Sequence, residues 1–254
     1  MEPARFCRLA AALILLACSA TAQRIVSKTT DADGNGGTTY TIQFDGPAVG
    51  LGAIIENMPY SLERKIEHVR TLANGTRSST TDVAPMYRDS LGRRRLDSYL
   101  FRGQYSTEGL RIICIRDFVG EYEYILDPVN RIAHRLNMPR SIAHGMPTRM
   151  DHVPLPPPPA LVDSLGPQMI DGFLAEGRRI TANDKHQVAV NEFWVNKNLE
   201  FVIRANDREA NGMETIESLI NVSHAEPDPA LFQVPSSYRV VDENSRFAVV
   251  IKTR

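Results

Sequence analysis

The sequence predicts a mainly β protein, with one domain of curved antiparallel sheet over residues 45–254, a long flap loop and few short helices. Runs rich in Val, Ile, Thr and Tyr recur about every ten residues and are separated by turn residues, as in antiparallel meanders. No helical period dominates after the first 22 residues. Paired turn signals such as Asn74-Gly75 lie between the runs and indicate hairpins.

The N-terminal segment has the pattern of an export signal. Arg5 and Arg8 precede an apolar run, residues 9–17, that is too short to span a bilayer. Ala20-Thr21-Ala22 follows and fits the small-residue rule for signal peptidase. We therefore predict that residues 1–22 are a signal peptide. The protein is then exported, periplasmic or extracellular, and its mature chain has no transmembrane span.

Leu15 to Cys18 also fits a lipoprotein box, so anchoring through a lipid on Cys18 is the alternative to a free mature chain. Removal of the signal peptide takes away one acid and two bases, which changes the formal net charge from −1 to −2. A chain so close to neutral offers no field that attracts nucleic acid or acidic membrane. Cys114 would then be the single cysteine, and we expect it to be buried, unreactive and without a disulfide.

Residues 23–44 are polar and rich in Gly and Thr, so we predict a flexible N-terminal lead. Asp31, Asp33 and Asn35 have the alternating spacing of a calcium loop. The terminal glutamate of such a loop is missing, because Ile42 stands in its place. The lead is therefore not a calcium site.

Turn chemistry orders the strands that follow. Asp127-Pro128-Val129-Asn130 has the composition of a type I turn, so residues 122–126 and 131–136 should pair as a hairpin. Asp171-Gly172 indicates another turn between two strands. Near the C-terminus Asp228 is a helix N-cap and Pro229 the first helical residue, so one helical turn should tuck Leu231 and Phe232 beneath the sheet.

Residues 137–160 break the strand rhythm and end in a proline run, which predicts a Met/Pro-rich flap loop. Its apolar residues should touch a bound apolar ligand or the sheet. A copper(I) site is the alternative, since thioether and imidazole groups suit that ion outside the cytoplasm. We favour a flap without metal or cofactor. The expected ligand-binding residues are Met138, Ile142, Met146, Met150 and Trp194, and the alternative metal set is His144, Met146, Met150 and His152.

The remaining arginine cluster and histidines are interpreted as surface residues without a binding role. The basic cluster at residues 93–95 should lie in a solvated turn, because its arginines alternate between faces. The remaining histidines are expected at the surface of separate strands. They are His68, His134, His186 and His224.

Four stretches, "MYRDSLGRRR", "YILDPVNRIAHRL", "LGPQMIDGFLAEGRRIT" and "EPDPALFQVPSSY", resemble a family of uncharacterised secreted proteins abundant in acidobacteria. The resemblance covers residues 60–242. More distantly, the chain resembles the LolA/LolB-like lipoprotein-carrier superfamily. That resemblance implies a half-barrel, in which a curved antiparallel sheet cups an acyl chain.

No motif pairs a nucleophile with a base: G-x-S-x-G, H-E-x-x-H and C-x-x-C are all missing from the sequence. We therefore expect no enzyme. In "LRIICIRDF" both strand faces carry apolar residues, which favours a sheet with a second, ligand-binding face. The prediction is an exported envelope protein that binds an apolar ligand, a lipid or a lipoprotein in the concave face. The alternative is a β-sheet interaction or structural module that docks an envelope protein and has no ligand cavity.

Overall fold

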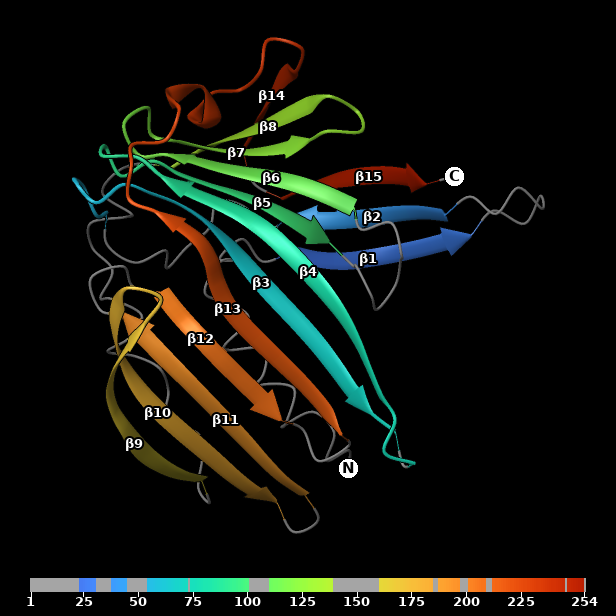
Figure 1. Cartoon of the computed structure of the whole chain (residues 1–254). Helices are drawn as coiled ribbons and strands as arrows, with labels where there is room; N and C mark the ends of the chain where they lie inside the picture. Colours follow the sequence, from blue (N-terminus) through green and yellow to red (C-terminus); the bar gives the residue numbers. More distant parts are fainter. Residues whose placement is uncertain are drawn as a thin grey trace. The chain divides into compact units, whose positions relative to one another are not determined.

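A computed structural model describes the chain in ten ranges and divides it into two compact units. The predicted mainly β, antiparallel fold class is confirmed by the strands of both units (Figure 1). The sequence did not indicate the division. The described residues are 23–30, 38–44, 54–72, 74–100, 110–138, 160–184, 187–196, 201–208, 212–244 and 246–253.

Unit 2 contains two sheets. One has the hydrogen-bonded order β14-β8-β7-β6-β5, with the end of β4 beside β5, and the other has the order β1-β2-β15. All of their strand pairs are antiparallel except β14 with β8, which is parallel. The strands are β1 Gln23–Thr30, β2 Thr38–Phe44, β5 Arg94–Leu100, β6 Leu110–Asp117, β7 Tyr122–Asp127, β8 Ile132–Asn137, β14 Arg239–Glu243 and β15 Phe247–Thr253.

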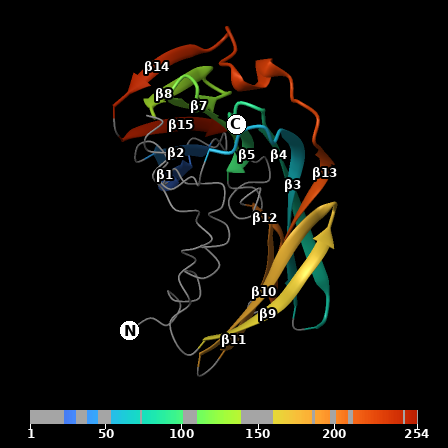
Figure 2. The same ribbon diagram turned by 90° about the vertical axis from the view of Figure 1, so that its left-hand side faces the viewer.

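The two sheets of unit 2 pack face to face, as Figure 2 shows for β2 and β15 against β7 and β8. Every second residue of β2 points into this core, and β15 alternates in the same way. Phe44 and Phe247 are cross-strand partners with rings stacked 4.9 Å apart. The core comprises Tyr40, Ile42, Phe44, Ile112, Ile125, Leu136, Phe247, Val249 and Ile251.

The opposite face of the larger sheet of unit 2 is covered by the predicted corner. Pro229–Phe232 forms a 3-10 helix (η1), Asp228 caps it by accepting from the backbone N–H of Ala230 at 2.9 Å, and Phe232 is buried. Phe232 packs in a second core with Ile113, Ile115, Leu126 and Ala133. Both faces of β6 are thus buried within unit 2.

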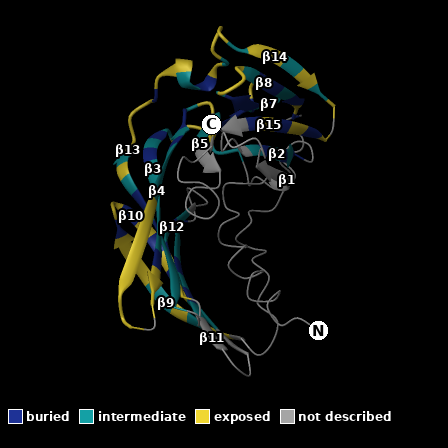
Figure 3. Cartoon of the chain, turned by 90° about the vertical axis from the view of Figure 1, so that its right-hand side faces the viewer, coloured by how far each residue is buried: buried dark blue, intermediate teal, exposed yellow. Residues whose placement is uncertain are grey.

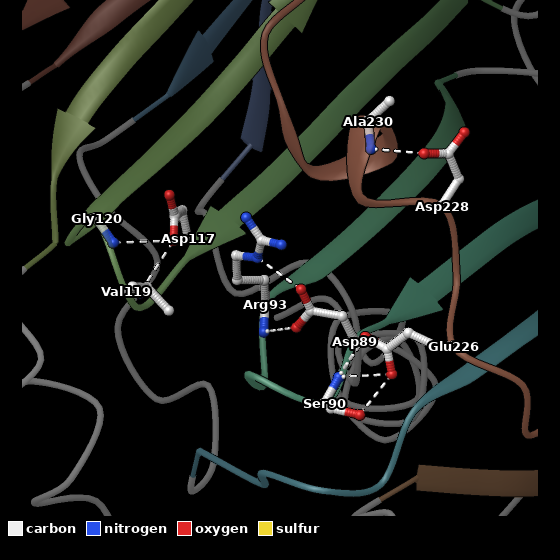
Figure 4. Close-up of polar contacts among 9 residues, drawn as sticks. All are labelled: Asp89, Ser90, Arg93, Asp117, Val119, Gly120, Glu226, Asp228 and Ala230. Atoms are coloured by element: carbon white, nitrogen blue, oxygen red, sulfur yellow. Dashed lines mark hydrogen bonds and ion pairs between the residues drawn. The ribbon is translucent and has the colours of Figure 1, made fainter.

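Polar contacts hold the turns around this corner (Figure 4). Arg93 donates to Asp89 through its backbone N–H at 2.8 Å and through Nε at 2.6 Å, and its guanidinium lies over the ring of Phe232. The backbone N–H and the hydroxyl of Ser90 both donate to the Glu226 carboxylate, which comes from the segment after β13. Arg95 donates to Asp97 and to the carbonyl of Leu231.

Unit 1 contains one sheet with the order β4-β3-β13-β12-β11-β10-β9, in which β3 and β4 contribute residues 62–71 and 77–85. The printed register of β9 to β13 is antiparallel throughout. The strands are β3 Tyr60–Thr71, β4 Arg77–Arg88, β9 Ala160–Ile170, β10 Phe173–Asp184, β11 Gln187–Asn196, β12 Phe201–Arg208 and β13 Met213–Ser223.

The three predicted hairpin turns are present. The turn around Asn74-Gly75 joins β3 to β4, and Leu72 N–H donates to the Thr76 carbonyl across it. Asp171 and Gly172 join β9 to β10 with φ of 51° and 85°, the left-handed pair that a tight hairpin needs. Asp127 Oδ1 accepts from the N–H groups of Val129 and Asn130 between β7 and β8.

Three sequence expectations differ from the structure. The lead 23–44 contains β1 and β2, and β2 supplies part of the unit 2 core instead of a flexible tail. The arginines of residues 93–95 are held by the carboxylates of Asp89 and Asp97 and by the rings of Phe232 and Phe118 instead of lying in a solvated turn. His134 is buried, stacks on Phe247 and makes a 2.7 Å contact with Glu243.

Candidate ligand-binding face

The two faces of the unit 1 sheet differ in chemistry. Residues that stand opposite each other on neighbouring strands share a face, so the register assigns the side chains. One face, called here the Phe193 face, contains the row Arg178, Phe193, Ala205 and Glu217. The other, called the Trp194 face, contains the row Gly177, Trp194, Arg204 and Ser218.

The Phe193 face is apolar and buried over the central strands. Phe193 is 6% exposed, and Ala205 and Leu219 are buried as well. Val195 continues this face along β11, but its partner on β10 is the exposed Glu176, and a register shift precedes its pairing with Val202 on β12. Such a surface of buried apolar side chains is what a hydrocarbon chain would contact.

At the β9–β10 end the same face is exposed. Met169 and Leu174 are cross-strand partners and are 62% and 60% exposed, and Val162 is exposed too. Leu174 lies on the Phe193 face because it stands four residues before Arg178 on β10. Large apolar side chains gathered in this way mark an interaction surface.

One ion pair is embedded in the Phe193 face. Arg64 on β3 donates to Glu217 on β13 through Nε at 2.6 Å and through a terminal nitrogen at 2.8 Å. Their side chains are 11% and 7% exposed. The bidentate geometry neutralises both charges, so the face gains no net charge from the pair.

The Trp194 face carries exposed ion pairs. Arg179 pairs with Glu192, while Arg208 and Arg77 both donate to Glu214. The hydrogen bond from Arg208 is the main reason that the pKa of Glu214 lies below its ordinary value, and the pKa of Arg208 is raised by the same bond. Alternating charges of this kind are typical of a solvated part of a sheet face. At the β9–β10 end the same face is apolar and buried, with Ile170, Phe173 and Ala175.

Trp194 itself packs across the strand onto Gly177. A Cβ at Gly177 would lie 2.5 Å from Nε1 of Trp194 and 2.9 Å from Cβ of Leu165. Glycine therefore makes room for the indole, as expected where another group approaches the backbone closely.

Of the predicted ligand-binding residues, only Met138 and Trp194 lie within the described part of the chain, one in each unit. Met138 packs in unit 2 with Phe118 and Ile54, and its N–H donates to the Glu121 carbonyl. Trp194 lies on the charged face of unit 1. Ile142, His144, Met146, Met150 and His152, with the flap residues 139–159, lie outside the described residues, so the flap stays a prediction.

Two further observations concern the described ranges alone. No three His, Cys, Asp or Glu side chains gather there closely enough to hold a metal ion. Within the same ranges, no helix has the length and apolar character needed to cross a membrane.

Cys114 is half-buried beside the unit 2 core, with its Sγ 3.4 Å from an oxygen of Glu123.

Sequence reasoning missed the Arg64–Glu217 pair and the row around Phe193. The signal for the row was the alternation in "QVAVNEFWV", which separates Phe193 from Trp194. The sequence places Trp194 on a second, ligand-binding face, and this stays a prediction. The row of Phe193 and Ala205 lies on the opposite face. Arg64 and Glu217 are 153 residues apart, so no local pattern pairs them.

Comparisons with known proteins gave structural likenesses alone. No family model matches the sequence, and no curated protein matches it. Among solved structures, the chain is similar to the MucA/MucB complex of Pseudomonas aeruginosa, at 15% identity and TM-score 0.35 over 72% of this chain and 58% of that one. This chain therefore spans little more than half of that neighbour.

Two other solved structures are similar over most of their own length. A LolA superfamily protein from Nitrosomonas europaea has 8% identity and TM-score 0.30 over 71% of this chain and 92% of that one. Lipoprotein LppX from Mycobacterium tuberculosis has 9% identity and TM-score 0.29 over 66% and 88%. The first of these descriptions names the superfamily that the sequence resembles. None of these three descriptions names the acidobacterial family.

Proposed function

We propose that the protein is an exported, non-enzymatic binding protein whose Phe193 face takes the hydrocarbon chain of a lipid or of a lipoprotein. The observation that carries the proposal is the contrast between the two faces of one sheet. Between β10 and β13, ion pairs lie on the Trp194 face, whereas Phe193, Ala205 and Leu219 are buried on the other face and Met169 and Leu174 are exposed at its β9–β10 end. Transfer of apolar surface from water to a hydrocarbon chain is favourable, at about 25 cal/mol per Å².

The single tryptophan of the chain provides a test. Bromine quenches indole fluorescence at short range, so a brominated monoacylglycerol reports which face it contacts. We would compare two proteins: the wild type, with Trp194 on the charged face, and the double variant Phe193→Trp with Trp194→Phe, which moves the indole to the apolar face. The lipid should quench the double variant strongly and the wild type weakly.

Equal quenching of both proteins, or quenching of neither, would contradict the proposal. A third protein, carrying Leu174→Lys in the double-variant background, checks the exposed end of the face. A lysine there should weaken binding about tenfold, because a charge would have to be desolvated against the hydrocarbon chain. The same substitution at Leu161, on the Trp194 face, is its control and should leave binding unchanged.

The interaction module remains the second candidate, because β9 ends the strand order and exposes Leu161. Another chain could add a strand there. Two features of β9 oppose this, namely the register shift beside Gly166, whose φ is 75°, and Pro167, which has no N–H. Native mass spectrometry of protein taken from its own envelope separates the candidates, because a carrier should release lipid on extraction and a module should retain a protein partner.

A further inference from the structure

A polar row crosses the Phe193 face next to the row of Phe193 and Ala205. Asn191 on β11 stands opposite Asp207 on β12, and Asp207 stands opposite Thr215 on β13. His68 on β3 completes the row, with its Nδ1 3.2 Å from the hydroxyl of Thr215. Four neighbouring strands therefore place four hydrogen-bonding side chains side by side.

Asn191 is the unusual member of this row. It is 4% exposed, and its side-chain oxygen has no hydrogen-bond partner in the part of the chain that the structure describes. Buried polar atoms are nearly always hydrogen-bonded, because an unpaired acceptor keeps the full cost of losing water. The adjacent Asp207 adds carboxylate oxygens, which only accept when ionised.

The polar row adjoins the apolar part of the face directly. Phe193 follows Asn191 by two residues on β11, and Ala205 precedes Asp207 by two residues on β12. In that next row the charges of Arg64 and Glu217 are paired with each other, and Arg178 is exposed at its β10 end. A molecule lying along β11 would thus meet the side-chain oxygen of Asn191 at one row and the ring of Phe193 at the next.

We propose that the row of Asn191, Asp207, Thr215 and His68 receives the head group of an amphiphile, and that this head group is a hydrogen-bond donor with hydroxyl or ammonium groups. The inference rests on the proposed function and names its ligand class. An anionic head, such as a free carboxylate or a phosphate, would face the oxygens of Asn191 and Asp207 and be disfavoured.

The test compares three ligands with the same acyl chain: a monoacylglycerol, which donates hydrogen bonds, the methyl ester, which only accepts, and the fatty-acid anion. Binding is measured by bromine quenching in the Phe193→Trp, Trp194→Phe protein. The monoacylglycerol should bind about tenfold more tightly than the methyl ester, because its donor satisfies the buried oxygen. The anion should bind most weakly.

Asn191→Leu should remove most of that preference while leaving the affinity for the methyl ester unchanged. Asn191→Gln keeps an uncharged amide acceptor and should keep the preference, and the midpoint of chemical unfolding of each variant identifies a folding defect. Asn206→Leu, on the Trp194 face, is the matched control and should keep the preference too. Equal binding of the ester and the glycerol ligand, or a preference that survives Asn191→Leu, would overturn the inference alone. Failure of every ligand to quench would overturn the proposed function with it.

Discussion

In unit 2 the chain covers both faces of its larger sheet (buried residues are dark blue in Figure 3), whereas in unit 1 the ion pairs of β10 to β13 lie on the face opposite Phe193, Ala205 and Leu219. Strand β6 is covered on both faces, because Ile112 packs against β2 and β15 while Ile113 and Ile115 pack beneath η1. In unit 1, Phe193 and Trp194 are adjacent in sequence, yet one faces apolar side chains and the other ion pairs. Apolar residues on both faces of a strand therefore indicate a covered sandwich in unit 2 and give no evidence of a cavity there.

The largest expected effect tests whether β2 belongs to the core of unit 2. Phe44→Ala should destabilise the unit by about 4 kcal/mol, because it removes a fully buried ring and leaves a cavity against Phe247. Hydrogen exchange read peptide by peptide should show faster exchange in β2, β6 and β15. Val250→Ala, at an exposed position of β15, should change little. Equal effects of the two variants would mean that residues 38–44 belong to a flexible N-terminal lead and do not contribute to the unit 2 core.

The next effect concerns the buried charges of unit 1. Glu217→Gln leaves the Arg64 guanidinium buried without its counter-charge and should cost about 3 kcal/mol. Chemical denaturation followed by Trp194 emission measures it. Glu214→Gln, in a more exposed pair on the opposite face, should cost less than about 1 kcal/mol. If Arg64→Met combined with Glu217→Leu fails to regain stability, the loss does not come from the unpaired charge.

A smaller effect tests the packing of the Trp194 face. Gly177→Ala should destabilise unit 1 by about 2 kcal/mol, because the added methyl group overlaps the indole of Trp194 and Cβ of Leu165. The emission maximum of Trp194 should shift as the ring moves. Gln168→Ala, at an exposed position of β9, is the control. Unchanged stability and emission would show that the ring can move aside freely.

The features predicted correctly from sequence are those set by local chemistry. The turn at Asp127 and the cap at Asp228 depend on side chains that bond to backbone a few residues away, so a short stretch contains the whole cause. The place of β2 depends on pairing with β15, some two hundred residues later, which no local pattern reveals. The Arg64–Glu217 pair also joins residues far apart in the sequence, so no local pattern predicts it. For the same reason the sequence did not predict the face on which the proposed site lies.

The smallest effect concerns surface charge, where the two units should behave alike. Arg208 lowers the pKa of Glu214 in unit 1 from its ordinary 4.5, and Arg135 lowers the pKa of Asp242 in unit 2 from its ordinary 3.8, in each case chiefly through a hydrogen bond. A carboxyl whose pKa falls on folding adds stability that is complete above its ordinary pKa and is lost as the pH falls through the lowered one.

Carboxyl NMR titration should therefore find both midpoints below those ordinary values. Arg208→Ala should raise the midpoint of Glu214 and leave that of Asp242 alone, and Arg135→Ala should do the reverse. High salt should weaken both shifts, because these pairs are open to solvent and ions screen them. The stability that Glu214 contributes should stay below about 1 kcal/mol. If high salt leaves the pKa shift of only one of the two carboxyls unchanged, that ion pair behaves as a buried one. The two units would then differ in their surface charges as well as in how their sheets are covered.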